Sequence, residues 1–120
     1  MKVAVTSGGR ELTSRFDTRF GRAAYFIVYE LDGGHWSWHD NVQNYEAAQG
    51  AGIQAADTVR RLGATALVTG HVGPKAFKVL AASGIKIYTT AAQTVQEALD
   101  AYKSGALSPQ TAADVEGHWV

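Results

Sequence analysis

A strand, a helix and a second strand follow one another closely in the middle of the chain, and this succession constrains the fold most. The apolar run Thr65–Thr69 reads as a strand, and Pro74 opens a helix that continues to Ser83. Gly84 is placed to end that helix, and the apolar run Ile85–Tyr88 follows at once. A helix between consecutive strands is the crossover that parallel strands require. The sequence therefore predicts an α/β fold.

The remaining elements extend this core on both sides. Apolar alternation and turn residues predict three earlier strands, a helix before Thr65 and a last helix opened by the capping box Thr94-Val95-Gln96-Glu97 and ended by Gly105. The strands are Lys2–Thr6, Ala24–Leu31 and His35–Asp40, and the earlier helix is Ala47–Leu62. Together they give a five-stranded mixed sheet, with an antiparallel hairpin at one edge and helices covering it. Residues 1–107 form the expected domain and residues 108–120 a C-terminal tail.

Composition limits the functions that such a domain can have. Its 120 residues carry 11 basic and 11 acidic side chains, and the zero formal net charge argues against a general nucleic-acid or membrane binder. The chain has no cysteine, so disulfides, thiolate nucleophiles and cysteine-ligated metal centres are excluded. No apolar run approaches the length of a membrane span or a cleavable leader, so we expect a cytoplasmic protein.

The connection between Thr69 and the helix at Pro74 is the best candidate for a binding site. It combines two glycines that allow close backbone approach with the positive end of a helix, worth roughly half a unit charge. An imidazole and an ammonium group stand beside those amides. The candidate residues are Gly70, His71, Val72, Gly73 and Lys75. A plain strand-to-helix turn is the alternative interpretation of the same segment.

A second candidate segment is the long loop Ser7–Arg22, which carries four arginines. In α/β sheets, ligands bind beyond the carboxyl ends of the parallel strands, where the loops after Thr6 and Thr69 both emerge. We therefore expect the two segments to meet. Arg15, Arg19 and Arg22 are the loop residues expected at the site. A solvated position is the alternative for each of them, and stabilisation of the local turn is the alternative for His71.

Other patterns give weaker signals. Trp36 and Trp38 share one face of their strand and could stack a ligand, but sheet packing is the favoured interpretation. His35 and His39 lie about 13 Å apart by strand rise, too far to chelate one metal. The segment Gly50–Ala55 resembles a dinucleotide-binding pattern, yet a polar segment rather than a strand precedes it.

The sequence lacks the residue patterns of two common classes of enzyme, the two-metal enzymes and the serine hydrolases. The strands Lys2–Thr6 and Thr65–Thr69 contain no acid, so a two-metal carboxylate site lacks its ligands. There is also no Gly-x-Ser-x-Gly nucleophile elbow. We therefore expect a binding protein that is not an enzyme.

Several separate segments together resemble one known family. They are Phe20–Ala23, Gly50–Ile53, Val68–Phe77, Gly84–Tyr88 and Thr94–Leu99 with Tyr102. In order and spacing they resemble the dinitrogenase iron–molybdenum cofactor biosynthesis family over roughly Met1–Leu107. The resemblance implies a ribonuclease H-like fold and a carrier or chaperone for an anionic metal–sulfur cluster, with a protein that receives the cluster as a further partner. Where some members carry histidines before the first helix, this chain has Asn44–Gln49.

The cargo implied by this resemblance is a molybdenum–copper sulfide cluster held without covalent attachment, or alternatively the iron–molybdenum cofactor or its precursor. A polyanionic sulfide cluster needs several diffuse N–H donors, which arginines and backbone amides supply. His71 would act as a donor or as a direct metal ligand. Two other functions stay open: a sensor of a small anion or nucleotide that uses the same corner, and a protein-interaction module that uses the hairpin edge.

Overall fold

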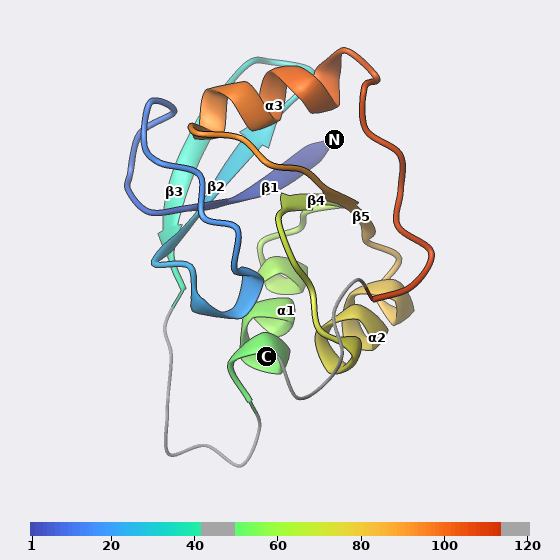
Figure 1. The fold of residues 1–120 in the computed structure, drawn as a ribbon. Coiled ribbons are helices and arrows are strands. Elements are labelled where there is room, and N and C mark those ends of the chain that lie inside the picture. The colour runs from blue at the N-terminus through green and yellow to red at the C-terminus, as the bar shows by residue number, and fades with distance from the viewer. Residues whose placement is uncertain (42–49, 114–120) are drawn as a thin grey trace.

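The computed structural model describes residues 1–41 and 50–113. In these two ranges the chain forms five strands, three α-helices and one short 3-10 helix (Figure 1). In chain order they are β1 (Lys2–Ser7), η1 (Phe20–Arg22), β2 (Tyr25–Glu30), β3 (Trp36–Asp40), α1 (Ala51–Arg61), β4 (Ala66–Thr69), α2 (Pro74–Ala82), β5 (Lys86–Thr89) and α3 (Val95–Lys103). His118 and Trp119 lie outside the described residues.

All five strands form one sheet in the order β3-β2-β1-β4-β5. β1 pairs with β4 and β4 with β5 in parallel, whereas β2 is antiparallel to both β1 and β3. The predicted mixed sheet with a hairpin at its edge is therefore confirmed. The ribonuclease H-like assignment stays a prediction.

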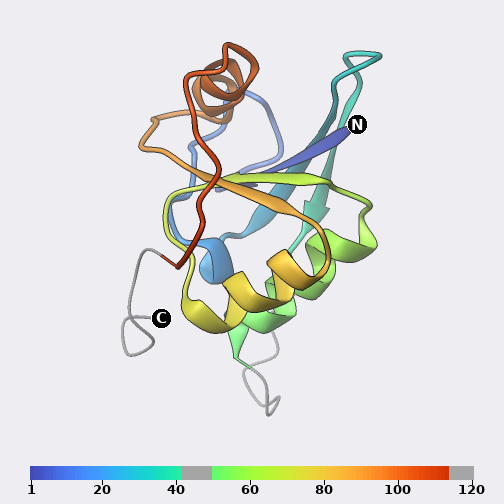
Figure 2. The ribbon, with the colours of Figure 1, turned by 90° about the vertical axis from the view of Figure 1, so that its right-hand side faces the viewer.

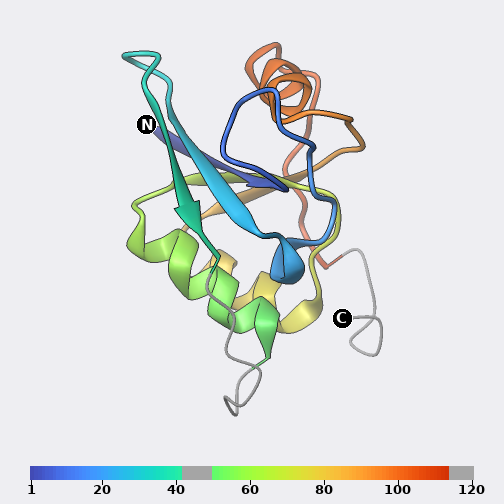
Figure 3. The ribbon, with the colours of Figure 1, turned by 90° about the vertical axis from the view of Figure 1, so that its left-hand side faces the viewer.

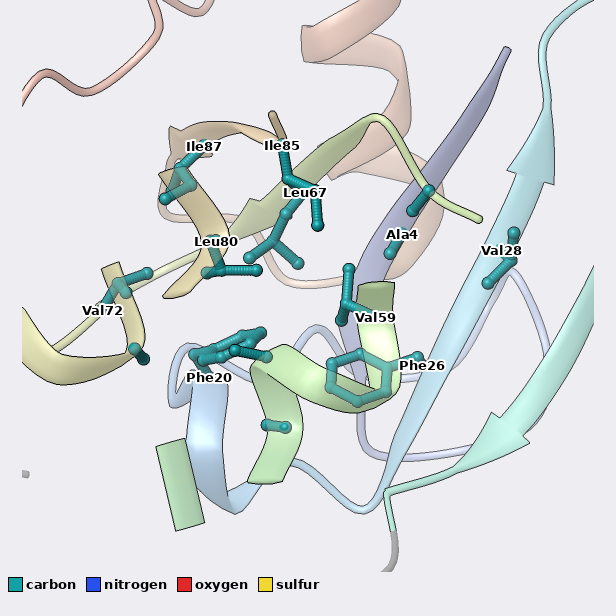
Figure 4. Packing of buried hydrophobic residues seen from close by; sticks show 14 residues of the cluster. Ala4, Phe20, Phe26, Val28, Val59, Leu67, Val72, Leu80, Ile85 and Ile87 are labelled. Atoms are coloured by element: carbon teal, nitrogen blue, oxygen red, sulfur yellow. The ribbon is translucent and has the colours of Figure 1, made fainter. Parts of the chain in front are cut away.

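Helices cover both faces of the sheet (Figure 2), with α3 on one side and the α1–α2 pair on the other. The central strand β1 serves both cores because its side chains alternate: Val3 and Val5 pack under α3, and Ala4 packs under α1 and α2. The larger core lies on the α1–α2 side (Figure 4), where Phe20 from η1 packs against Phe26 from β2 with ring centroids 5.9 Å apart. Burying Phe20 fixes the end of the arginine loop against the sheet.

Two helix expectations need correction. The helix expected over Ala47–Leu62 begins at Ala51, because Gly50 has an extended backbone and serves as its N-cap. In α2, helical spacing predicts Phe77, Leu80 and Ala81 on the inward face, but Ala81 is exposed and Ala76 is buried instead. Ala76 and Leu80 are four residues apart and share the face toward α1, whereas Ala81 is turned away by one further residue.

The two edges of the sheet differ. On the β5 side, the chain after α3 returns along the sheet: Pro109 forms a bridge with Tyr88, and the Gln110 N–H donates to Ile87 O at 2.7 Å. On the other side, β3 has no further strand beside it among the described residues.

The predicted boundary between domain and tail at residue 107 stays a prediction. No helix in the two described ranges is long and apolar enough to cross a bilayer.

Candidate anion-binding cleft

The arginine loop and the segment after β4 lie against each other. The His71 N–H donates to Thr18 O at 2.7 Å, and the Phe20 N–H donates to His71 O at 3.3 Å. Gly70 permits this approach, because a Cβ atom at that position would collide with the side chain and backbone of Thr18. The loop thus pairs like an additional strand with the end of β4.

Buried hydroxyl groups hold the base of this arrangement at the carboxyl ends of β1 and β4. The hydroxyl oxygens of Thr6 and Thr69 lie 2.9 Å apart at full burial. Thr6 also binds the loop through Asp17, whose N–H donates to Thr6 O at 3.2 Å. Because these groups have partners within the protein, the loop is fixed in position without a ligand.

A cleft of about 680 Å³ opens where η1, the start of α1 and the start of α2 meet. Its lining residues are Arg19, Phe20, Gly21, Arg22, Gly50, Ala51, Gly52, Ile53, His71, Gly73, Pro74, Lys75 and Ala76. The start of α1 is the wall that the sequence analysis missed, since Gly50–Ala55 was considered there only as a weak dinucleotide-binding pattern. The available signal was a glycine N-cap followed by a first turn without an acid.

The N-termini of two helices, α1 and α2, therefore lie at the same cleft. The N-caps are Gly50 for α1 and Gly73 for α2, and neither provides a side-chain cap. Neither first turn contains an acidic residue. Since the first N–H groups of a helix have no acceptor within the helix, both ends present amide donors and partial positive charge.

Glycines bring the three walls together. A Cβ atom on Gly21 would lie 2.9 Å from the backbone N of Gly52, so η1 packs backbone to backbone on α1. A Cβ atom on Gly52 would lie 3.2 Å from the Cβ of Ala76, so the first turn of α1 lies directly on α2. The first contact excludes a side chain at position 21, the second leaves only a tight fit at position 52, and together they set the width of the cleft.

The ionisable side chains at the cleft are all basic. Arg19, Arg22, Lys75 and His71 all line it and are exposed, and the described lining contains no acid. Asp17 stands beside the cleft, where its carboxylate forms an ion pair with Arg19 (Oδ1 to Nε, 3.3 Å). This hydrogen bond and the charge of Asp17 raise the pKa of Arg19 above its ordinary value and offset part of its charge.

Comparison with known proteins assigns the chain to a family. The model of the family described as "Dinitrogenase iron-molybdenum cofactor" matches residues 1–105. The chain belongs to this family. The resemblance inferred from its sequence segments is thereby confirmed.

Solved structures of similar proteins share the fold of this family member. The apo form of the orange protein from Desulfovibrio gigas is 36% identical, with a TM-score of 0.89 and coverage of 95% of this chain and 96% of that chain. A putative NifB protein from Thermotoga is 34% identical, with a TM-score of 0.80 and coverage of 95% and 97%. By sequence alone, an uncharacterized protein of Methanocaldococcus jannaschii is 25% identical over 96 residues, which are 78% of this chain and 81% of that protein.

The structure brings most of the predicted site residues of this family member together. Arg19, Arg22, His71, Gly73 and Lys75 line the cleft. Behind this lining, Gly70 is buried against the arginine loop, and the Val72 side chain, 1% exposed, packs into the core. These two residues support the cleft from behind rather than face it.

Arg15 lies elsewhere. Its backbone forms a bridge with Thr94 at the start of α3, and its carbonyl accepts from the Gly8 N–H at 2.8 Å. Arg15 is therefore held on the α3 side and does not line the cleft.

Asn44–Gln49 lie outside the described residues. Among the residues that are described, no group of three His, Cys, Asp or Glu side chains could hold a metal ion.

Proposed function

We propose that this protein binds an anionic molybdenum-containing metal–sulfur cluster in the cleft and carries it without covalent attachment and without catalysing a reaction. The observation that carries the proposal is the convergence of two glycine-capped helix N-termini with Arg19, Arg22, Lys75 and His71 on one opening. Amide N–H groups and basic side chains are the donors that a polyanion requires.

The shape and polarity of the cleft support a bulky anion of low hydration. Its volume of about 680 Å³ lies in the range typical of small-molecule sites and is far larger than a single phosphate needs. Apolar groups from Phe20, Ile53 and Pro74 stand among the donors. Such a lining suits the surface of a sulfide cluster, which carries diffuse negative charge and accepts weak hydrogen bonds.

The proposed cargo is a molybdenum–copper sulfide cluster, with the iron–molybdenum cofactor or its precursor as the alternative. The family description supports molybdenum, and the similarity to the orange protein supports a small carrier. In this proposal His71 contributes a hydrogen bond or a direct bond to a metal at the rim of the cleft. A receiving protein would take up the cargo in the cytoplasm.

A titration of the metal-free protein tests the proposal. Tetrathiomolybdate and copper(I) are added, the visible absorption is followed, and molybdenum and copper per chain are counted after desalting. We expect retained colour at a fixed stoichiometry, weakened in His71→Ala. Loss of all metal on desalting, together with binding of inorganic phosphate or a nucleotide to the same cleft, would favour the anion or nucleotide sensor instead.

A further inference from the structure

Two tryptophans of the edge strand β3 pack against the neighbouring strand and still remain partly exposed. Trp36 is 37% and Trp38 is 42% exposed, so the expected sheet packing covers each indole only in part. Their cross-strand partners are Tyr29 and Ile27, which place both indoles on the α3 side of the sheet, beyond the area that α3 covers. Tyr25 completes the patch, because its ring meets the Trp38 ring edge-on at 5.9 Å between centroids.

The backbone of β3 presents unused hydrogen-bonding positions at the same edge. The Glu30 N–H donates to His35 O at 2.7 Å, and the Asn41 N–H donates to Ala24 O at 3.0 Å, so His35 and Asn41 direct their backbone groups toward β2. Because these directions alternate along an antiparallel strand, Trp36, Trp38 and Asp40 direct theirs outward. Figure 3 shows β3 as the last strand of the sheet.

This edge has few of the features that normally protect an exposed strand. β3 contains no lysine, proline or glycine, and its one charged side chain of fixed sign is Asp40 at its end. The opposite edge, by contrast, is covered by Pro109 and Gln110 of the same chain. A weakly protected edge with exposed aromatic side chains is a template for strand addition.

The charges beside the patch indicate which partner fits. The Arg10 guanidinium lies over the Trp38 ring at 4.5 Å and over the Tyr25 ring at 5.4 Å. On the same side, the Lys103 ammonium lies over the Tyr29 ring at 4.9 Å. Neither cation forms an ion pair with any residue that the structure describes. Asp40 adds one exposed carboxylate on the same face of β3, opposite Tyr25, so the edge combines two cations with one anion. The excess positive charge lies beside Trp38 and Tyr29, where an acidic side chain could neutralise it.

We propose that the β3 edge binds an extended acidic segment of a partner protein as a sixth strand. Backbone groups of Trp36, Trp38 and Asp40 pair with the segment. Its side chains on the α3 side place apolar groups against the two indoles and a carboxylate beside Arg10. Those on the other side meet Ser37 and His39 and are polar. This inference does not depend on which anion the cleft holds.

A peptide titration followed by NMR tests this edge. The probe is the acetylated, amidated heptapeptide Thr-Val-Thr-Glu-Thr-Val-Thr, which presents two valines and one glutamate on a single face when extended. Its matched control carries lysine in place of glutamate. We expect the glutamate peptide to shift the amide signals of β3 and the indole signals of Trp36 and Trp38, and to bind at least about fivefold more tightly than the lysine peptide.

Two variants separate the contribution of the Arg10 charge to peptide binding from that of the two indole side chains. Arg10→Gln should remove the preference for glutamate while weak binding persists, and the double variant Trp36→Thr with Trp38→Thr, which retains strand propensity, should abolish binding. Metal retention by the cleft should be unchanged in both, and a dispersed NMR spectrum verifies the fold. Equal binding of the two peptides, shifts confined to the cleft, or a dimer of the free chain formed through β3 would each overturn the proposal.

Discussion

Arg15 and Arg22 are exposed arginines of the same loop, yet only Arg22 lines the cleft. The difference comes from the backbone. Arg15 is paired with Thr94 at the start of α3, and the chain reaches the end of β4 only after Asp17. Such long-range pairing leaves no local signature, so the sequence could not distinguish the two arginines.

Removal of single charges at the cleft should therefore weaken cargo binding selectively. We expect Arg22→Ala and Lys75→Ala each to lower cluster affinity by about two- to fivefold, the modest size reflecting exposed side chains. Arg15→Ala serves as the matched control and should behave like the wild type. Competition with a copper(I) chelator measures the affinity. An equal loss in Arg15→Ala would place the cargo outside the cleft.

Two glycine-to-alanine substitutions should show whether close backbone packing, rather than backbone flexibility, requires glycine at position 21. In Gly21→Ala the new Cβ would meet the backbone of Ala51 and Gly52, which cannot rotate away, so we expect a loss of about 1–3 kcal/mol in unfolding free energy. In Gly50→Ala the new Cβ meets no atom within 4 Å, so only the poorer N-cap propensity of alanine counts, and a loss below about 1 kcal/mol is expected. Urea denaturation compares the two variants. Similar midpoints would mean that η1 does not pack tightly on α1.

The elements themselves were largely predictable. Alternation, capping and glycine stops identified every strand, and the capping box of α3 is present as predicted, with the Thr94 hydroxyl accepting from the Glu97 N–H at 3.2 Å. The start of α1 and the exposure of Trp36 and Trp38 were missed. Alternation shows that residues share a face, but only the extent of α3 decides whether that face is covered.

The capping box should contribute measurably to the stability of α3. Thr94→Ala removes the acceptor for the Glu97 N–H and should cost about 1 kcal/mol of unfolding free energy. Thr94→Ser keeps the hydroxyl and should retain most of that stability. Thermal and urea unfolding measure the difference. Because α3 lies on the opposite face of the sheet, cargo binding below the transition should not change.

For the whole molecule, the zero net charge conceals a local excess of positive charge at the cleft. Arg19, Arg22 and Lys75 line it and its described lining contains no acid, whereas α3 on the other face carries both signs, with Glu97, Asp100 and Lys103. An anion approaching the cleft therefore encounters a local positive field even though the molecule as a whole is neutral.

Cargo uptake should accordingly depend on ionic strength. Between 0.1 and 1 M salt the screening length falls from about 10 Å to about 3 Å, and we expect the association rate of the thiomolybdate–copper cluster to fall by roughly tenfold. Stopped-flow absorption measures this rate. A rate independent of salt would show that uptake is not guided by charge.

The coverage of the β5 edge by residues 109 and 110 limits how many neighbours this sheet can acquire. Unlimited growth of a sheet from one subunit to the next needs two open edges on every subunit, and residues 1–41 and 50–113 offer one. Any assembly through strand pairing is therefore monovalent: it stops at a single added strand or a single pair of copies. The chain can recruit a partner through its backbone and still terminate a fibril rather than propagate it.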